Sequence, residues 1–244
     1  MTTLSSRIAL ITGANKGIGL EIARQLGRSG ATVLLGARTA TLGEAAAAGL
    51  RAEGIDVRYL PIELTSAESI ASAAATISDA YGRLDVLVNN AGITDQADGP
   101  PSSCSMNSVR RIFDTNFFGS LAVTQAMLPL LRTSGSGRIV NVSSGLGSLT
   151  HNADPSWQYA RVKLLGYNAS KTALNMLTVQ LAAELRDTGI KVNAADPGYT
   201  ATDLNGHRGT QTIPQGAAAA VRLALLGDDG PTEGFFSAGR SEPW

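Results

Sequence analysis

The chain has 244 residues, of which 43% are hydrophobic, and its 20 basic and 20 acidic side chains give a formal net charge of zero. This balance, with a charged fraction of 16%, gives no electrostatic basis for binding nucleic acid or an anionic membrane surface. The length suits one large α/β domain, which we expect to span residues 1–244.

The cysteine and hydropathy patterns are typical of a reducing compartment. Cys104 is the single cysteine, which excludes an internal disulfide and a cysteine-based metal cluster, and we expect no metal site. The sequence does not open on a basic segment followed by a long apolar run, and no uninterrupted apolar segment approaches membrane-spanning length. We therefore expect a cytoplasmic protein that acts without a membrane partner.

Short apolar runs alternate with alanine- and leucine-rich helical stretches along the whole chain. The runs lie at 8–11, 32–35, 57–60, 86–88, 139–142, 191–194 and 234–237. Such short, continuous runs are typical of strands buried on both faces. The alternation predicts an α/β fold, a doubly wound parallel sheet of about seven strands with helices on both faces. Ligands of these sheets bind beyond the carboxyl ends of the strands, so the residues there are candidates.

The first run leads into a glycine-rich turn, which is followed by an amphipathic helix. The turn reads Thr12-Gly13-Ala14-Asn15-Lys16-Gly17-Ile18-Gly19. Gly13 permits the tight turn, Gly17 removes a side chain where a diphosphate approaches, and Gly19 allows close packing of helix and strand. A βα connection without a ligand is the alternative, but strand, turn and helix together favour a phosphate site. Its predicted cofactor-binding residues are Gly13, Asn15, Lys16, Gly17, Ile18 and Gly19.

The end of the second run favours NADP over NAD. Gly36-Ala37-Arg38 lacks the acid that an NAD-binding chain usually places there to bind the ribose 2′-hydroxyl. Arg38 offers a planar cation for a 2′-phosphate, and Lys16 adds a second positive charge. Two solvated surface cations are the alternative, which leaves the missing acid unexplained.

Other strand ends supply further candidates for the cofactor site. Glu63 and Leu64 follow the third run, where a carboxylate could accept a hydrogen bond from an adenine amine. Asn90, Ala91 and Gly92 follow the fourth, where small residues allow the backbone to approach a ribose; an ordinary polar turn is the alternative. After the sixth run we predict contacts from Pro197, Gly198, Thr200 and Thr202, and then a mobile flap at about 201–213.

Tyr167 and Lys171 are four residues apart at the start of a strongly helical stretch, so they share a helix face. A free phenol has a pKa of about 10, and a neighbouring ammonium is expected to lower it. Tyr159 and Lys163 have the same spacing, but Gly166 interrupts the helical pattern just beyond them. We therefore favour the Tyr167 pair, which a sustained apolar face would hold against the sheet.

Three further polar positions accompany this pair. Ser143 and Ser144 directly follow the fifth run, and Asn116 lies among aromatic residues in Phe113-Asp114-Thr115-Asn116-Phe117-Phe118-Gly119. A buried Asn must find partners, either structural or in a proton path. The segment 145–166 is polar, is predicted to be irregular, and contains His151 and Trp157.

Together, the glycine turn, Asn89–Gly92, Asn116, Ser144, Tyr167–Lys171 and Pro197-Gly198 resemble the short-chain dehydrogenase/reductase family over essentially the whole chain. Within the family, the sequence is most similar to NADPH-dependent carbonyl reductases. The resemblance implies a Rossmann-type fold and a catalytic set of Asn116, Ser144, Tyr167 and Lys171. It implies that the nicotinamide delivers hydride to a carbonyl carbon while Tyr167 donates a proton to the oxygen held by Ser144. Lys171 is then expected to lower the tyrosine pKa and bind the nicotinamide ribose, and Asn116 to serve a water-linked proton relay.

Two departures from the family pattern stand out. Glu63 takes the place of a usual Asp, and Ser144 and Tyr167 are 23 positions apart, wider than in most members. We expect the inserted segment to lie on the substrate side, with Ser144, Trp157 and Tyr167 contacting a small-molecule carbonyl substrate. The oligomeric state stays open. Alternatives are an NADP-linked secondary-alcohol dehydrogenase and a non-catalytic NADP-sensing interaction protein.

Overall fold

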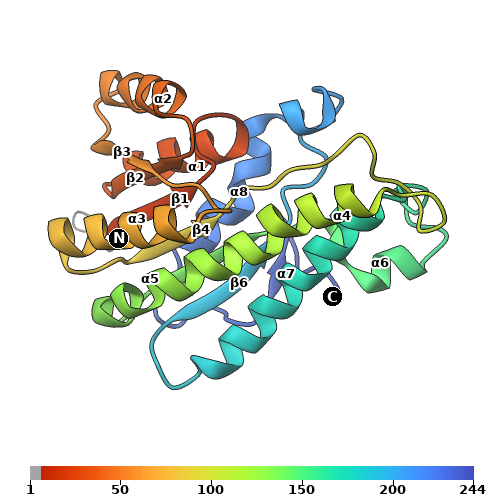
Figure 1. Cartoon of the computed structure of the whole chain (residues 1–244). Coiled ribbons are helices and arrows are strands. Elements are labelled where there is room, and N and C mark those ends of the chain that lie inside the picture. Colours follow the sequence, from red (N-terminus) through yellow and green to blue (C-terminus); the bar gives the residue numbers. More distant parts are fainter. Residues whose placement is uncertain (1–6) are drawn as a thin grey trace.

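The computed structural model describes residues 7–244, which form a seven-stranded parallel sheet in the order β3-β2-β1-β4-β5-β6-β7 (Figure 1). The sheet matches the predicted fold, and each strand coincides with a predicted apolar run. The strands are β1 Ile8–Thr12, β2 Thr32–Ala37, β3 Val57–Pro61, β4 Val86–Asn89, β5 Arg138–Val142, β6 Lys191–Ala195 and β7 Phe235–Phe236. Because neighbouring strands are all parallel, their carboxyl ends meet at one edge of the sheet.

Helices connect the strands. They are α1 Gly17–Arg28, α2 Ala40–Ala52, α3 Ala67–Tyr81, α4 Met106–Phe113, a π-helical turn η1 Asp114–Gly119, α5 Ser120–Ser134, a 3-10 turn η2 Gly145–Gly147, α6 Leu149–Ala153, α7 Leu165–Glu184, a 3-10 turn η3 Asp203–Asn205 and α8 Ile213–Ala224. Among the helices of residues 7–244, none has the length and hydropathy needed to cross a bilayer.

Successive strand residues point to opposite faces of the sheet and so build two hydrophobic cores. Helices α1, α2 and α8 cover one face, where strand residues such as Ile11 and Val88 are buried. Helices α3, α5 and α7 cover the other, where Leu10 and Leu87 are buried (Figure 1). Both faces are therefore shielded, as the continuous apolar runs predicted.

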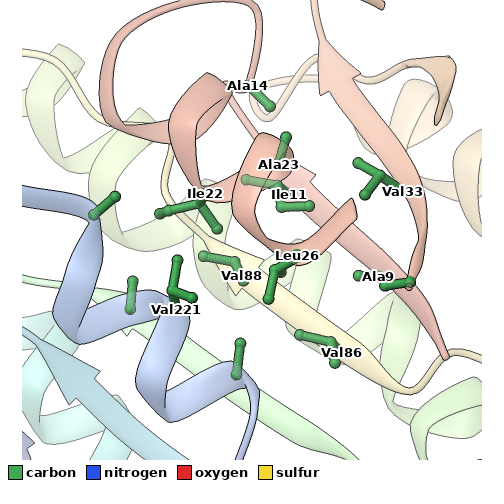
Figure 2. Packing of buried hydrophobic residues seen from close by; sticks show 14 of the residues in the cluster. Ala9, Ile11, Ala14, Ile22, Ala23, Leu26, Val33, Val86, Val88 and Val221 are labelled. Carbon is green, nitrogen blue, oxygen red and sulfur yellow. The ribbon is translucent and has the colours of Figure 1, made fainter. Parts of the chain in front are cut away.

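Packing of α1 against the sheet fixes the glycine turn that precedes it. Figure 2 shows Ile22 and Leu26 of α1 lying against Ile11 and Val88, with Val221 of α8 beside them. Ile22, Ile11 and Val88 are fully buried. Each such side chain contributes about 1.5–3 kcal/mol relative to an exposed one. This contact holds the start of α1 directly beyond the end of β1.

The structure differs from the sequence expectation in two places along 145–166. This segment was predicted to be irregular, yet it contains η2 and the short helix α6. The Ser148 hydroxyl caps α6 by accepting a hydrogen bond from the His151 amide at 3.1 Å. Helix α7 begins at Leu165, so Gly166 lies inside the helix that it was predicted to precede.

Candidate active site

The glycine turn between β1 and α1 combines close packing with open space. Gly13 and Gly17 have φ values of +63° and +57°, which few other residues adopt readily. A Cβ on Gly13 would lie 2.9 Å from the Ala91 Cα, and one on Gly19 would lie 2.4 Å from the Asn90 Nδ2. At Gly17 a Cβ would meet only a Thr202 methyl group at 3.9 Å. Gly13 and Gly19 therefore serve packing, while Gly17 leaves room for a phosphate group above the turn.

A cleft of about 660 Å³ extends from this turn across the carboxyl ends of the strands. Most residues predicted to bind the cofactor line it, namely Gly13, Asn15, Lys16, Gly17, Ile18, Gly19, Arg38, Glu63, Leu64, Asn90, Ala91, Gly92, Tyr167, Lys171, Pro197 and Thr202. Two predicted residues are engaged elsewhere: the Thr200 hydroxyl donates to the Pro197 carbonyl, and the Gly198 amide donates to Asp196. The cleft therefore gathers residues that follow six of the strands, and it extends from the glycine turn to Tyr167.

Both cations predicted to favour a 2′-phosphate are paired with carboxylates at the cleft. The Lys16 Nζ lies 2.6 Å from the Asp203 Oδ2, and the Arg38 Nε lies 3.2 Å from the Glu63 Oε2. The hydrogen bond from Lys16 lowers the pKa of Asp203, which also contacts His207 at 2.8 Å. These ion pairs are largely exposed and therefore weak.

Tyr167 and Lys171 are both buried on one face of α7. Tyr167 is 8% exposed and Lys171 3% exposed. The Lys171 Nζ donates to the Val142 carbonyl at 2.8 Å and lies 5.8 Å from the centroid of the Tyr167 ring. The Tyr167 hydroxyl is hydrogen-bonded to the Ser144 hydroxyl. Phenol, hydroxyl and ammonium therefore converge beside the end of β5.

The ionisation of this pair differs from the sequence expectation that Lys171 lowers the tyrosine pKa. Burial raises the pKa of Tyr167 to about 12, with the hydrogen bond from Ser144 lowering it and the charge of Asp196 raising it. Burial also lowers the pKa of Lys171 to about 8. Loss of hydration penalises both charged forms, and it is the largest cause of each of the two pKa shifts.

The two serines at the end of β5 have different partners. The Ser143 hydroxyl donates to the Asn175 Oδ1 at 2.5 Å and is buried. Ser144 accepts from the Leu146 amide at 3.2 Å and also contacts Tyr167. Ser144 is therefore the serine that faces the phenol.

Asn116 lies in the π-helical turn η1 and is fully buried. Its Oδ1 accepts from the Ile93 amide at 2.8 Å, and its Nδ2 donates to the Ile93 carbonyl and the Ser170 Oγ, each at 3.0 Å. Ser170 in turn donates to the Tyr167 carbonyl at 2.8 Å. The Asn116 side chain thus ties the loop after β4 to the backbone of Tyr167.

Aromatic rings of the inserted segment lie next to this site. A Cβ on Gly145 would be 3.3 Å from the Trp157 ring and 3.2 Å from the Asp196 Oδ2. Trp157 stacks on His151 at 4.8 Å between ring centroids and meets Tyr159 edge-on at 5.4 Å. Tyr159 lies among these rings, outside any helix, so Tyr167 and Lys171 are the helical pair.

Sequence reasoning missed Asp196. This carboxylate follows β6 and accepts a hydrogen bond from the Gly198 amide at 2.9 Å. Burial raises its pKa, while amide hydrogen bonds from Gly198 and Gly145 lower it. The available signal was its place at a strand end directly before the Pro197-Gly198 turn.

Comparison with known proteins matches this architecture to an enzyme family. The family model described as short chain dehydrogenase matches residues 7–212. A short-chain dehydrogenase, anuI, of Penicillium roqueforti is 37% identical, over 93% of this chain and 92% of that protein. Carbonyl reductase [NADPH] 1 of Homo sapiens is 34% identical, over 97% and 98%. The crystal structure of NADPH-bound carbonyl reductase from chicken fatty liver superposes with a TM-score of 0.85 at 27% identity, over 99% of this chain and 100% of that one.

Proposed function

The chain belongs to the short-chain dehydrogenase/reductase family, and on that premise we propose that it is an NADPH-dependent carbonyl reductase in which Tyr167 donates the proton. Members of this family are oxidoreductases that act on CH–OH or carbonyl groups of small molecules with a nicotinamide cofactor. The observation that carries the proposal is a continuous cleft, lined by the glycine turn at one end and by Tyr167 and Lys171 at the other. A bound cofactor would reach Tyr167 there, and Ser144, which is hydrogen-bonded to the phenol but does not line the cleft, would hold a carbonyl group beside it.

The residues that line the cleft fit a nicotinamide dinucleotide. The open space over Gly17 suits the diphosphate, and Asn90, Ala91 and Gly92 line the cleft where a ribose would lie. Arg38 and Lys16 would bind a 2′-phosphate, which favours NADPH. Similar relatives are named carbonyl reductase [NADPH], which supports this preference. When bound, the cofactor supplies the hydride.

The remaining chemistry is proton transfer by the chain's own residues. Ser144 would hold the carbonyl oxygen, and Tyr167 would donate its proton to it as the oxygen gains negative charge. Lys171, 5.8 Å from the ring centroid, would offset the phenolate charge that remains. Asn116 would help to return a proton from solvent through ordered water, and Trp157 would contact the substrate.

Carbonyl reduction is placed ahead of alcohol oxidation on the similarity to known proteins. Two relatives named carbonyl reductase [NADPH], of Rattus norvegicus and Homo sapiens, are each 34% identical to this chain. The raised pKa of Tyr167, about 12, keeps the phenol protonated at neutral pH before the cofactor binds. The same residues would serve a secondary-alcohol dehydrogenase, which is the second candidate function.

The test is NADPH oxidation, followed at 340 nm, with a panel of ketones, aldehydes and quinones and a parallel series with NADH. Turnover that prefers NADPH supports the proposal. Tyr167→Phe should lower kcat by about 10²-fold or more while NADPH still binds, because only the proton donor is removed. NADPH binding with no turnover of any carbonyl compound by the wild type would instead indicate a cofactor sensor.

A further inference from the structure

The first turn of α7, which carries Tyr167, is capped from outside the helix. The first amides of a helix have no partner within it and need acceptors from elsewhere. The N-cap residue Leu164 offers no side-chain acceptor. Instead, the Leu165 amide donates to the Gly99 carbonyl at 2.9 Å. The amides of Gly166 and Tyr167 donate to the two carboxylate oxygens of Asp98, at 2.8 and 2.9 Å.

Asp98 is itself held in place by its own loop. Its amide donates to the Asp95 carbonyl at 3.0 Å, and its Oδ1 accepts from the Gly99 amide at 2.9 Å. The Asp95 carboxylate pairs with Arg111 of α4. The loop that supplies the cap is therefore anchored to α4.

Gly166 makes this arrangement sterically possible. A Cβ there would lie 3.0 Å from the Ile112 Cδ1, 3.2 Å from the Val109 Cα and 3.3 Å from the Asp98 Oδ1. The start of α7 therefore packs closely between α4 and the Asp98 carboxylate. A negative charge at this point also interacts favourably with the positive end of the helix dipole.

We propose that Asp98 is a positioning residue for Tyr167: its two carboxylate oxygens fix the first turn of α7 and so set where the phenol meets Ser144. This inference rests on the proposed function, in which Tyr167 is the proton donor. The Tyr167 backbone is held at both ends, by Asp98 at its amide and by Ser170 at its carbonyl. Loss of the first contact lets the donor move relative to the reacting oxygen.

The test compares Asp98→Ala and Asp98→Asn with the wild type in NADPH-dependent ketone reduction. We expect Asp98→Ala to lower kcat by roughly 10- to 100-fold, because small displacements of catalytic groups are costly. Its Kd for NADPH should stay within about twofold, since the glycine turn lies between β1 and α1. Asp98→Asn keeps one acceptor oxygen for the two α7 amides, so its kcat should lie between those of the wild type and Asp98→Ala. This variant keeps the test valid if the alanine variant does not fold. Asp187→Asn, which changes an exposed carboxylate beyond the C-terminal end of α7, is the control and should keep the wild-type kcat.

A double-mutant cycle separates positioning from general destabilisation. In a Tyr167→Phe background, removal of Asp98 should cause no further loss of kcat, because the group that it positions is already absent. The inference would be overturned if removal of Asp98 lowered kcat by the same factor in the wild type and in Tyr167→Phe. It would also be overturned if Asp98→Asn were as active as the wild type. Amide hydrogen exchange gives a readout that does not depend on activity, and Gly166 and Tyr167 should exchange faster in Asp98→Ala. A wild type that reduces no carbonyl compound would instead count against the proposed function.

Discussion

The immediate surroundings of Tyr167 keep its phenol protonated. Burial raises the pKa of Tyr167 to about 12, and the nearby Asp196 carboxylate adds to the rise. Asp196→Asn removes a negative charge, which makes the phenolate less unfavourable and lowers the pKa of Tyr167. For carbonyl reduction, we expect the alkaline limb of the kcat profile to move to lower pH, because the donor loses its proton earlier.

The measurement is kcat against pH for the wild type, Asp196→Asn and the control Asp154→Asn. The asparagine at 196 keeps an oxygen that can accept from the Gly198 amide, so the turn after β6 should persist. Asp154 is exposed in the inserted segment, and its removal should leave the limb unchanged. An alkaline limb that stays in place or moves to higher pH in Asp196→Asn would contradict the electrostatic argument.

The proposed preference for NADPH also depends on single residues. Lys16→Ala and Arg38→Ala should each raise the Kd for NADPH by about tenfold, since each removes a charged partner of the 2′-phosphate. The Kd for NADH should change much less, because NADH lacks that phosphate. Fluorescence titration of both cofactors measures this, with Arg28→Ala, another exposed cation, as the control. Equal increases in the Kd for NADPH and for NADH would show that neither residue contacts the 2′-phosphate.

At the scale of elements, residues of the segment 201–213 line the cleft. It contains η3, and Asp203 joins it to Lys16 of the glycine turn. A phosphate and Asp203 would compete for the same ammonium. We therefore expect Asp203→Asn to lower the Kd for NADPH by roughly two- to fivefold, a small gain because exposed ion pairs are weak.

Titration of NADPH at two salt concentrations tests this competition. The gain from Asp203→Asn should shrink at high salt, which screens the ion pair. The exposed Asp229→Asn is the control and should bind NADPH as the wild type does. Weaker binding of NADPH by Asp203→Asn would mean that the segment 201–213 helps to hold the cofactor instead of competing with it.

Elements were predictable from the sequence where their signals are local. Strands such as β1 and β5 are short apolar runs, and the Tyr167 and Lys171 pair follows from helical spacing together with the apolar helix face that comes after it. The start of α7 was misplaced because its cap, Asp98, lies 69 residues before Tyr167 in the chain. The pKa of Tyr167 was predicted in the wrong direction because burial depends on packing that no local pattern encodes.

At the scale of the whole molecule, helices packed on both faces of the sheet hold the site in place. Ile22 on one face and Leu181 on the other belong to separate cores, and the strands between them carry the glycine turn and Ser144 to a common edge. The order of the motifs along the chain was enough to predict this assembly. The contacts across the cleft, such as Lys16 with Asp203, were not predictable because they join segments 187 residues apart.

Burial of Lys171 makes the stability of the whole molecule depend on pH. Its pKa falls from 10.5 to about 8 on folding, so between these values the unfolded chain binds a proton that the folded chain lacks. The contribution of Lys171 to the free energy of unfolding therefore rises between about pH 8 and 10.5, by up to about 3 kcal/mol. Tyr167, whose pKa is raised to about 12, gives the opposite slope only above about pH 10, where its unfolded form begins to ionise.

Urea unfolding of the ligand-free protein at pH 8, 9 and 10 measures the effect. The free energy of unfolding of the wild type, relative to Lys171→Met, should increase with pH, because methionine has no proton to lose. Lys171→Met also leaves the Val142 carbonyl without its partner, but that cost does not vary with pH. Lys163→Met, which changes an exposed lysine, should follow the wild type across the series. A constant difference between the wild type and Lys171→Met would mean that Lys171 keeps its ordinary pKa in the folded protein, and its charge would then be available to Tyr167 throughout this range.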